Sequence, residues 1–77
     1  FTKVIGKILH MKEIKFAENL KRARKAASMS QESLAKKLGV DQRTVSAWEN
    51  GVARPGYEML AEICDIFDES FDSLLSE

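Results

Sequence analysis

The stretch SQESLAKKLGVDQRTVSAWENG, residues 30–51, decides the fold of this chain. Apolar residues at helical spacing mark the buried faces of two short helices, which are Leu34, Ala35 and Leu38 in the first and Val45 and Trp48 in the second. Gly39 directly follows the first pattern, and glycine adopts the positive φ that ends a helix and turns the chain sharply. The stretch therefore predicts two helices joined by a tight turn.

The ends of both helices carry residues that suit their positions. Ser30 can accept a hydrogen bond from the free N–H groups of the first helix, and Asp41 can do the same for the second. Glu32 lies in the opening turn of the first helix, near the positive end of the helix dipole. Ala35 is small enough to let the two helices cross closely. These features predict a helix-turn-helix, with helices over about residues 31–38 and 42–50.

The residues on both sides of this motif resemble those of the lambda-repressor and Cro-like (XRE-type) helix-turn-helix DNA-binding domains. FAENLKRARKAASMS, residues 16–30, is similar to the first helix of that family. ENGVARPGYEML, residues 49–60, is similar to its Glu-Asn-Gly turn, proline and fourth helix, and IFDESFDSLL, residues 66–75, to its last short helix. The resemblance implies an all-α fold, namely a compact five-helix lambda-repressor-like DNA-binding domain.

The first fifteen residues, FTKVIGKILHMKEIK, lie outside this likeness. We interpret residues 1–11 as an N-terminal extension and residues 12–77 as the helix-turn-helix domain. His10-Met11 is typical of a cloning junction, which leaves open whether residues 1–10 are native.

The remaining helices follow from apolar spacing. The first should begin between residues 12 and 16, end near residue 27, and bury Phe16, Leu20, Ala23 and Ala27. The fourth should bury Met59, Leu60, Ile63, Cys64 and Phe67. Asp68 then stands where the family usually has Gly, so the end of this helix is left open. Ser70 should cap a last helix that buries Phe71 and Leu74.

The resemblance also implies roles for individual side chains. The outward face of the second motif helix would meet base edges in the major groove, through Gln42, Arg43, Ser46 and Ala47. Glutamine suits adenine and arginine suits guanine, although phosphate contact is an open alternative for Arg43. Phosphate contacts are expected from Gln31, Thr44, Asn50 and Arg54.

Two further residues are expected to act in the structure itself. In the family, an arginine at the position of Arg24 pairs with the glutamate before the Asn-Gly turn, here Glu49. The alternative is two independent surface charges. Trp48 could stack on a ligand, but its phase with Val45 favours the core. Cys64 is expected to be inert core because no cation near it in the sequence would activate a thiolate.

The charge pattern bears on the partner. The net charge is zero, whereas DNA-binding domains are commonly basic. Residues 1–27 carry eight Lys/Arg and two Asp/Glu, residues 28–54 carry four and three, and residues 55–77 carry seven acids and no base. This polarity would turn positive potential toward phosphates and the acidic C-terminal helices away from them. A merely solubilising mixture of charges is the alternative.

Several classes of protein fit this composition poorly. A single Cys and a single His supply neither a disulfide nor a metal-ligand set, so we expect no metal and no cofactor. They also offer too little for a catalytic constellation, and we expect no enzyme. No apolar run approaches membrane-spanning length and no signal peptide is recognisable, which favours a cytoplasmic protein without membrane contact.

The function expected is sequence-specific binding of double-stranded DNA by a transcriptional regulator, in the form of a dimeric phage or bacterial-type repressor on a palindromic operator. Candidate dimer contacts are Met59, Ile66 and Leu75. No small-molecule effector is expected unless the chain is a piece of a longer protein. The alternative is a protein-interaction module or antitoxin that uses the same fold to bind a protein partner.

Overall fold

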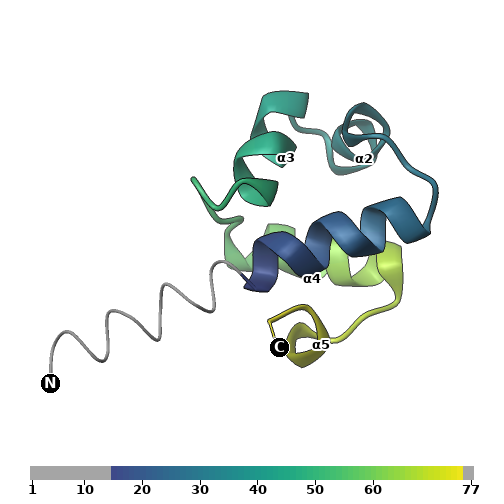
Figure 1. Cartoon of the computed structure of the whole chain (residues 1–77), viewed down its shortest axis with the longest axis vertical. Helices are drawn as coiled ribbons and strands as arrows, with labels where there is room; N and C mark the ends of the chain where they lie inside the picture. Colours follow the sequence, from purple (N-terminus) through teal and green to yellow (C-terminus); the bar gives the residue numbers. More distant parts are fainter. Residues whose placement is uncertain (1–14, 76–77) are drawn as a thin grey trace, which may run out of the picture.

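The computed structural model describes residues 15–75, which form five helices and no strand (Figure 1). The N-terminal helix covers residues 15–26 of the described range. It is followed by α2 (Gln31–Leu38), α3 (Gln42–Glu49), α4 (Tyr57–Phe67) and α5 (Phe71–Leu75). The predicted all-α architecture is confirmed. The interpretation of residues 1–11, with the junction at His10-Met11, lies outside the described residues.

The N-terminal helix runs across the middle of the molecule. In Figure 1, α2 and α3 lie on one side of it and α5 lies on the other, while α4 passes behind. The buried core draws on all five helices: Phe16, Leu20, Leu34, Ala35, Leu38, Val45, Trp48, Ile63, Cys64 and Leu74. Each large apolar side chain buried in this way contributes roughly 1.5 to 3 kcal/mol to the stability of the folded state. The inward faces predicted for α2 and α3 are therefore confirmed, Trp48 included.

The turn between α2 and α3 has the predicted chemistry. Gly39 has φ 72° and its N–H donates to the carbonyls of Ala35 and Lys36. The hydroxyl of Ser30 accepts from the N–H of Ser33 at 3.0 Å, and Asp41 begins α3 in extended backbone. α3 ends one residue earlier than predicted, at Glu49 with residue 50 as its C-cap. Glycine at positive φ is thus what lets the two helices follow one another so closely.

The end of the N-terminal helix corrects one prediction. Ala27 is exposed and Ala23 is only half-buried, because the helix stops at residue 26 and Ser28 turns the chain at φ 57°. Ala17 and Asn19 are buried instead. The amide of Asn19 donates to the carbonyl of Leu74 at 2.8 Å, which satisfies a backbone acceptor near the end of α5.

The C-terminal helices depart from the prediction in burial, since Met59, Leu60, Phe67 and Phe71 are only half-buried. Asp68 closes α4 in the left-handed region at φ 53°, although it lacks the freedom of glycine there. Phe71 is half-buried rather than buried, and its ring meets the ring of Tyr57 edge to face, with centroids 5.4 Å apart. Ser70 caps α5 as predicted, since its hydroxyl accepts from the N–H of Ser73 at 3.0 Å.

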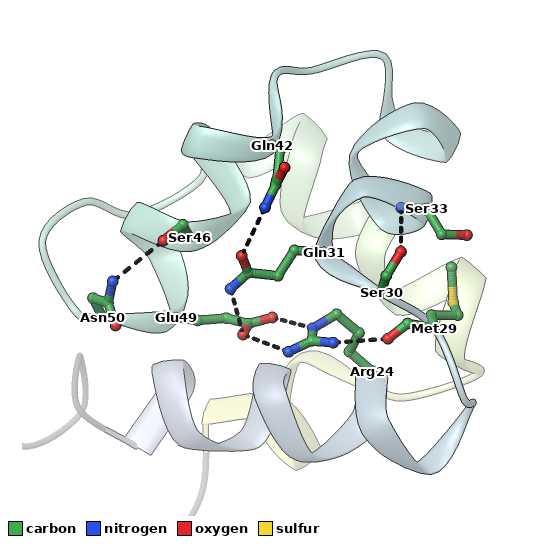
Figure 2. A network of polar contacts seen from close by, with 9 residues as sticks. All are labelled: Arg24, Met29, Ser30, Gln31, Ser33, Gln42, Ser46, Glu49 and Asn50. Atoms are coloured by element: carbon green, nitrogen blue, oxygen red, sulfur yellow. Dashed lines mark hydrogen bonds and ion pairs between the residues drawn. The ribbon is translucent and has the colours of Figure 1, made fainter.

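Arg24 and Glu49 form the predicted ion pair, which joins the N-terminal helix to the end of α3 (Figure 2). Arg24 Nε donates to Oε2 of Glu49 at 2.7 Å, and Nη2 donates to Oε1 at 3.0 Å. Arg24 Nη1 donates to the carbonyl of Met29 at 2.7 Å. The side chains are only 10% and 2% exposed. The hydrogen bonds to Glu49 raise the pKa of Arg24 more than burial lowers it, so the guanidinium stays charged.

Replacing Glu49 with Gln should therefore destabilise the fold strongly. The variant Glu49→Gln leaves the Arg24 charge buried without a counter-charge, and we expect a loss of about 3 to 5 kcal/mol in the free energy of unfolding. Urea denaturation measures it. Glu18→Gln is the matched control, because Glu18 only meets Lys15 in an exposed pair at 3.7 Å. Equal losses in the two variants would contradict a structural role for the buried pair.

The buried thiol predicts a second measurement. Burial of Cys64, followed by the nearby charges of Asp65 and Glu69, raises the pKa of its thiol above the ordinary value. Folding thus holds the proton on sulfur. The protonated thiol therefore favours the folded state below the pKa of the thiol in the unfolded chain, about 8.5, and this contribution to stability is lost as the pH rises beyond it. We expect iodoacetamide to modify Cys64 slowly in the native protein and quickly in urea. Rapid native-state modification at pH 8 would contradict this.

Candidate nucleic-acid interface

The outward face of α3 carries the four residues predicted to read bases. Gln42 and Arg43 are exposed in its first turn, and Ser46 and Ala47 follow one turn later, half-buried. The spacings i, i+4 from 42 to 46 and from 43 to 47 place the four on one side of the helix. The opposite side is held by Val45 and Trp48 in the core. α3 therefore presents a short polar surface on a fixed support.

A chain of hydrogen bonds connects the buried ion pair to this surface (Figure 2). Gln31 Nε2 donates to Oε1 of Glu49 at 3.2 Å, and Gln42 Nε2 donates to Oε1 of Gln31 at 3.4 Å. Gln31 belongs to α2, so one side chain of α2 contacts both ends of α3. The structure thus brings Gln31, Gln42, Arg24 and Glu49 into one network, which connects the Gln42 side chain to the buried ion pair.

Two other contacts lie on α3 itself. Asn50 Nδ2 donates to the hydroxyl of Ser46 at 3.3 Å, so the C-cap side chain leans along the helix toward the reading face. At the other end, Asp41 Oδ1 accepts from the N–H of Arg43 at 2.8 Å and lies 3.8 Å from Arg43 Nε. The sequence indicated Asp41 only as a cap, and the second contact was not foreseen.

The remaining predicted phosphate contacts are Thr44 in α3 and Arg54 in the loop that follows it. Thr44 is half-buried in the first turn of α3. Arg54 is exposed in the loop between α3 and α4. It lines a cleft of about 280 Å³ together with Phe16, Pro55, Leu60 and Leu75. Arg54 therefore lies beside residues of the N-terminal helix, α4 and α5.

The candidate dimer contacts do not share one environment. Met59 and Ile66 are half-buried and pack against the core, whereas Leu75 is 38% exposed. The other large apolar side chains exposed in the described part of the chain are Val52 at 80% and Tyr57 at 78%. Sequence reasoning missed both, since Tyr57 stands at helical spacing with Leu60 and Cys64 and apolar spacing alone does not mark it as exposed.

Exposed basic and acidic side chains lie on different helices. Lys21, Arg22 and Lys25 are exposed on the N-terminal helix. The acids of the C-terminal helices are also exposed, namely Glu58, Glu62, Asp65 and Asp72. In Figure 1, α5 lies across the N-terminal helix from α3. The N-terminal helix thus separates α5 from α3.

Other kinds of site find no support within residues 15–75. No cluster of three or more His, Cys, Asp or Glu side chains there could hold a metal ion. None of the described helices is long and apolar enough to cross a membrane.

Solved structures with this fold include a much longer enzyme chain. The structure of hydroxypropylphosphonic acid epoxidase from S. wedmorenis superposes with a TM-score of 0.77 at 34% identity, over 83% of this chain and 34% of that one. The crystal structure of FeII HppE in complex with substrate gives the same TM-score, and the match covers 37% of that chain. The match is confined to about a third of each enzyme chain, so it supports the fold and not the enzyme's activity.

Curated relatives are named as transcriptional regulators. YqaE of Bacillus subtilis (strain 168), an uncharacterized HTH-type transcriptional regulator, is 42% identical over 60 residues, which are 78% of this chain and 52% of YqaE. BcrR of Enterococcus faecalis, an HTH-type transcriptional activator, is 36% identical over 63 residues, or 82% of this chain and 31% of BcrR. This chain thus spans about half or less of the length of these relatives.

The helix-turn-helix family model HTH_3 matches residues 20–74, from the N-terminal helix to α5. The matched range includes the motif, the network around Glu49 and the reading face of α3. With the fold, the motif and these relatives in agreement, the chain belongs to the HTH_3 helix-turn-helix family.

Proposed function

We propose that this chain binds double-stranded DNA through α3 and thereby regulates transcription. The observation that carries the proposal is the contrast between the two sides of α3. Gln42 and Arg43 are exposed on one side, while Val45 and Trp48 are buried on the other. A helix held in this way can enter the major groove without rearranging. The relatives are named as HTH-type transcriptional regulators, which agrees with this proposal.

The chemistry of the reading face suggests what it would recognise. Gln42 can pair with N6 and N7 of adenine, and Arg43 can pair with O6 and N7 of guanine. The hydroxyl of Ser46 can serve as donor or acceptor, and Ala47 can accommodate only an apolar neighbour such as a thymine methyl group. Each good bidentate contact supplies about 1 to 3 kcal/mol of discrimination. Phosphate contacts from Gln31, Thr44, Asn50 and Arg54 would fix the register on the duplex.

One copy of this helix reads too few base pairs to find a unique site. A genome offers roughly 10⁶ to 10⁹ competing sites, and two half-sites multiply the discrimination of one. We therefore propose a twofold-symmetric dimer on a palindromic operator, with half-sites about one helical turn, or ~34 Å, apart.

The exposed apolar residues suggest where the dimer forms. Tyr57 is 78% exposed and its ring contacts Phe71, which lies one helical turn before Leu75 in α5. Met59 and Ile66 are already packed against the core. We place the contact on Tyr57, Phe71 and Leu75, at the end of α4 that follows the reading helix.

Occupation of promoter DNA by such a dimer would repress transcription sterically. BcrR is named an activator, so the position of the operator relative to the promoter would decide the sign in this chain. We propose that the protein acts in the cytoplasm. Its regulatory activity would need no cofactor, catalytic step or small-molecule effector. Occupancy would then follow protein concentration and dimerisation.

Selection of bound duplexes from a random DNA pool tests this function. The wild-type protein should enrich an inverted repeat at moderate salt. Gln42→Ala should relax the preference at one base pair of each half-site, because it removes a base contact and leaves the core intact. Arg54→Ala is the control. It should weaken binding to all sequences alike and reduce the salt slope by about one.

Enrichment of no sequence, with no binding at low salt, would contradict the proposal. It would favour the alternative reading of the chain as a protein-interaction module or antitoxin.

The dimer surface makes a separate prediction. Tyr57→Ser should shift the protein toward monomer in sedimentation and weaken binding to the full palindrome, while half-site affinity is retained. Val52→Ser is the matched control, since Val52 is equally exposed but lies in the loop before α4. A dimer unaffected by Tyr57→Ser would move the contact elsewhere.

A further inference from the structure

We infer that Asp41 is a positioning residue that directs the Arg43 guanidinium toward guanine and away from the phosphate backbone. The inference rests on the proposed function, because it concerns how the same face of α3 chooses its bases. It assigns a role in specificity to a residue that would otherwise be only a helix cap.

The geometry joins two contacts at a single carboxylate oxygen. Asp41 Oδ1 accepts the backbone N–H of Arg43 at 2.8 Å, and the same oxygen lies 3.8 Å from Nε of the Arg43 side chain. Asp41 itself is held in extended backbone at φ −76° and ψ 147° as the N-cap of α3. One oxygen therefore faces both the main chain and the side chain of the same reading residue.

This arrangement divides the donors of Arg43 in a useful way. A guanidinium has five N–H donors, one on Nε and four on the two terminal nitrogens. When the Nε edge faces Asp41, the two terminal nitrogens remain for a second planar partner. Two parallel acceptors, O6 and N7, are what the major-groove edge of guanine presents. Bases without this pair of acceptors would match the remaining donors less well.

The negative charge of Asp41 also acts against the competing partner of Arg43. A phosphate that approached Arg43 would come close to the Asp41 carboxylate and be repelled by it. A guanine edge carries no net charge and meets no such repulsion. The carboxylate thus favours the base over the backbone, which separates the two roles that the sequence left open for Arg43.

The free protein should show little of this effect. Arg43 and Asp41 are 96% and 65% exposed, and an ion pair so exposed adds little to stability. In the major groove water is displaced and the interaction between the two charges strengthens. The consequence of removing the charge should therefore appear in base discrimination and not in folding.

The test is Asp41→Asn, which removes the charge but keeps an oxygen that caps α3 as well as Asp does. Dissociation constants are measured by fluorescence anisotropy for the selected operator, for the operator with adenine in place of the guanine that Arg43 reads, and for an unrelated duplex. The thermal midpoint of unfolding should stay unchanged. Discrimination between guanine and adenine should fall roughly fivefold or more, and binding to the unrelated duplex should tighten.

Coupling to Arg43 separates positioning from a general charge effect. In an Arg43→Ala background, Asp41→Asn should no longer alter base discrimination, although it should still tighten binding to unrelated DNA. Unchanged discrimination in Asp41→Asn alone, or an equal loss in both backgrounds, overturns the inference while the proposed function stands. A wild-type protein that selects no DNA sequence would instead mark failure of the proposed function itself.

Discussion

The buried ion pair between Arg24 and Glu49 is the constraint on which the placement of α3 depends. α3 has only eight residues, and a helix so short gains little stability by itself. Its direction is therefore set by what holds it. The carboxylate of Glu49 fixes its C-terminal end to the N-terminal helix. Through Gln31, the same carboxylate is connected to Gln42 at the other end. One buried charge thus orients the whole helix.

Such a pair is better explained by orientation than by stability. An apolar pair of similar volume could be equally stable, because removing two charges from water is costly. The difference lies in geometry. Glu49 accepts from Arg24 Nε, Arg24 Nη2 and Gln31 Nε2 in three fixed directions, whereas apolar contacts permit sliding. Hydrogen bonds to base edges tolerate little angular error. A directional anchor at the C-terminal end of α3 would suit the base reading that we propose for this helix.

Local signals sufficed for much of the fold, and tertiary contacts account for what they missed. Ser30 and Gly39 mark helix ends by their own backbone chemistry, so the bounds of α2 could be predicted. The pairing of Arg24 with Glu49 came from the family resemblance, since no spacing rule connects residues so far apart. Asn19 is buried, and its amide donates to the carbonyl of Leu74 in α5. No residue near Asn19 in the sequence indicates that acceptor. The second contact of Asp41 depends likewise on a side-chain direction.

A net charge of zero is compatible with binding DNA because the charges are unevenly distributed, with every Lys and Arg in residues 1–54 and seven acids in residues 55–77. At physiological salt, interactions between exposed charges fade over about 8 Å. In Figure 1 the N-terminal helix lies between α5 and α3. Under the proposed function, phosphates bound near α3 would therefore interact mainly with nearby charges such as Arg43. At low salt the screening length grows to about 30 Å. Repulsion between the phosphates and the acidic C-terminal helices would then rotate the whole protein so that α3 faces the duplex before contact.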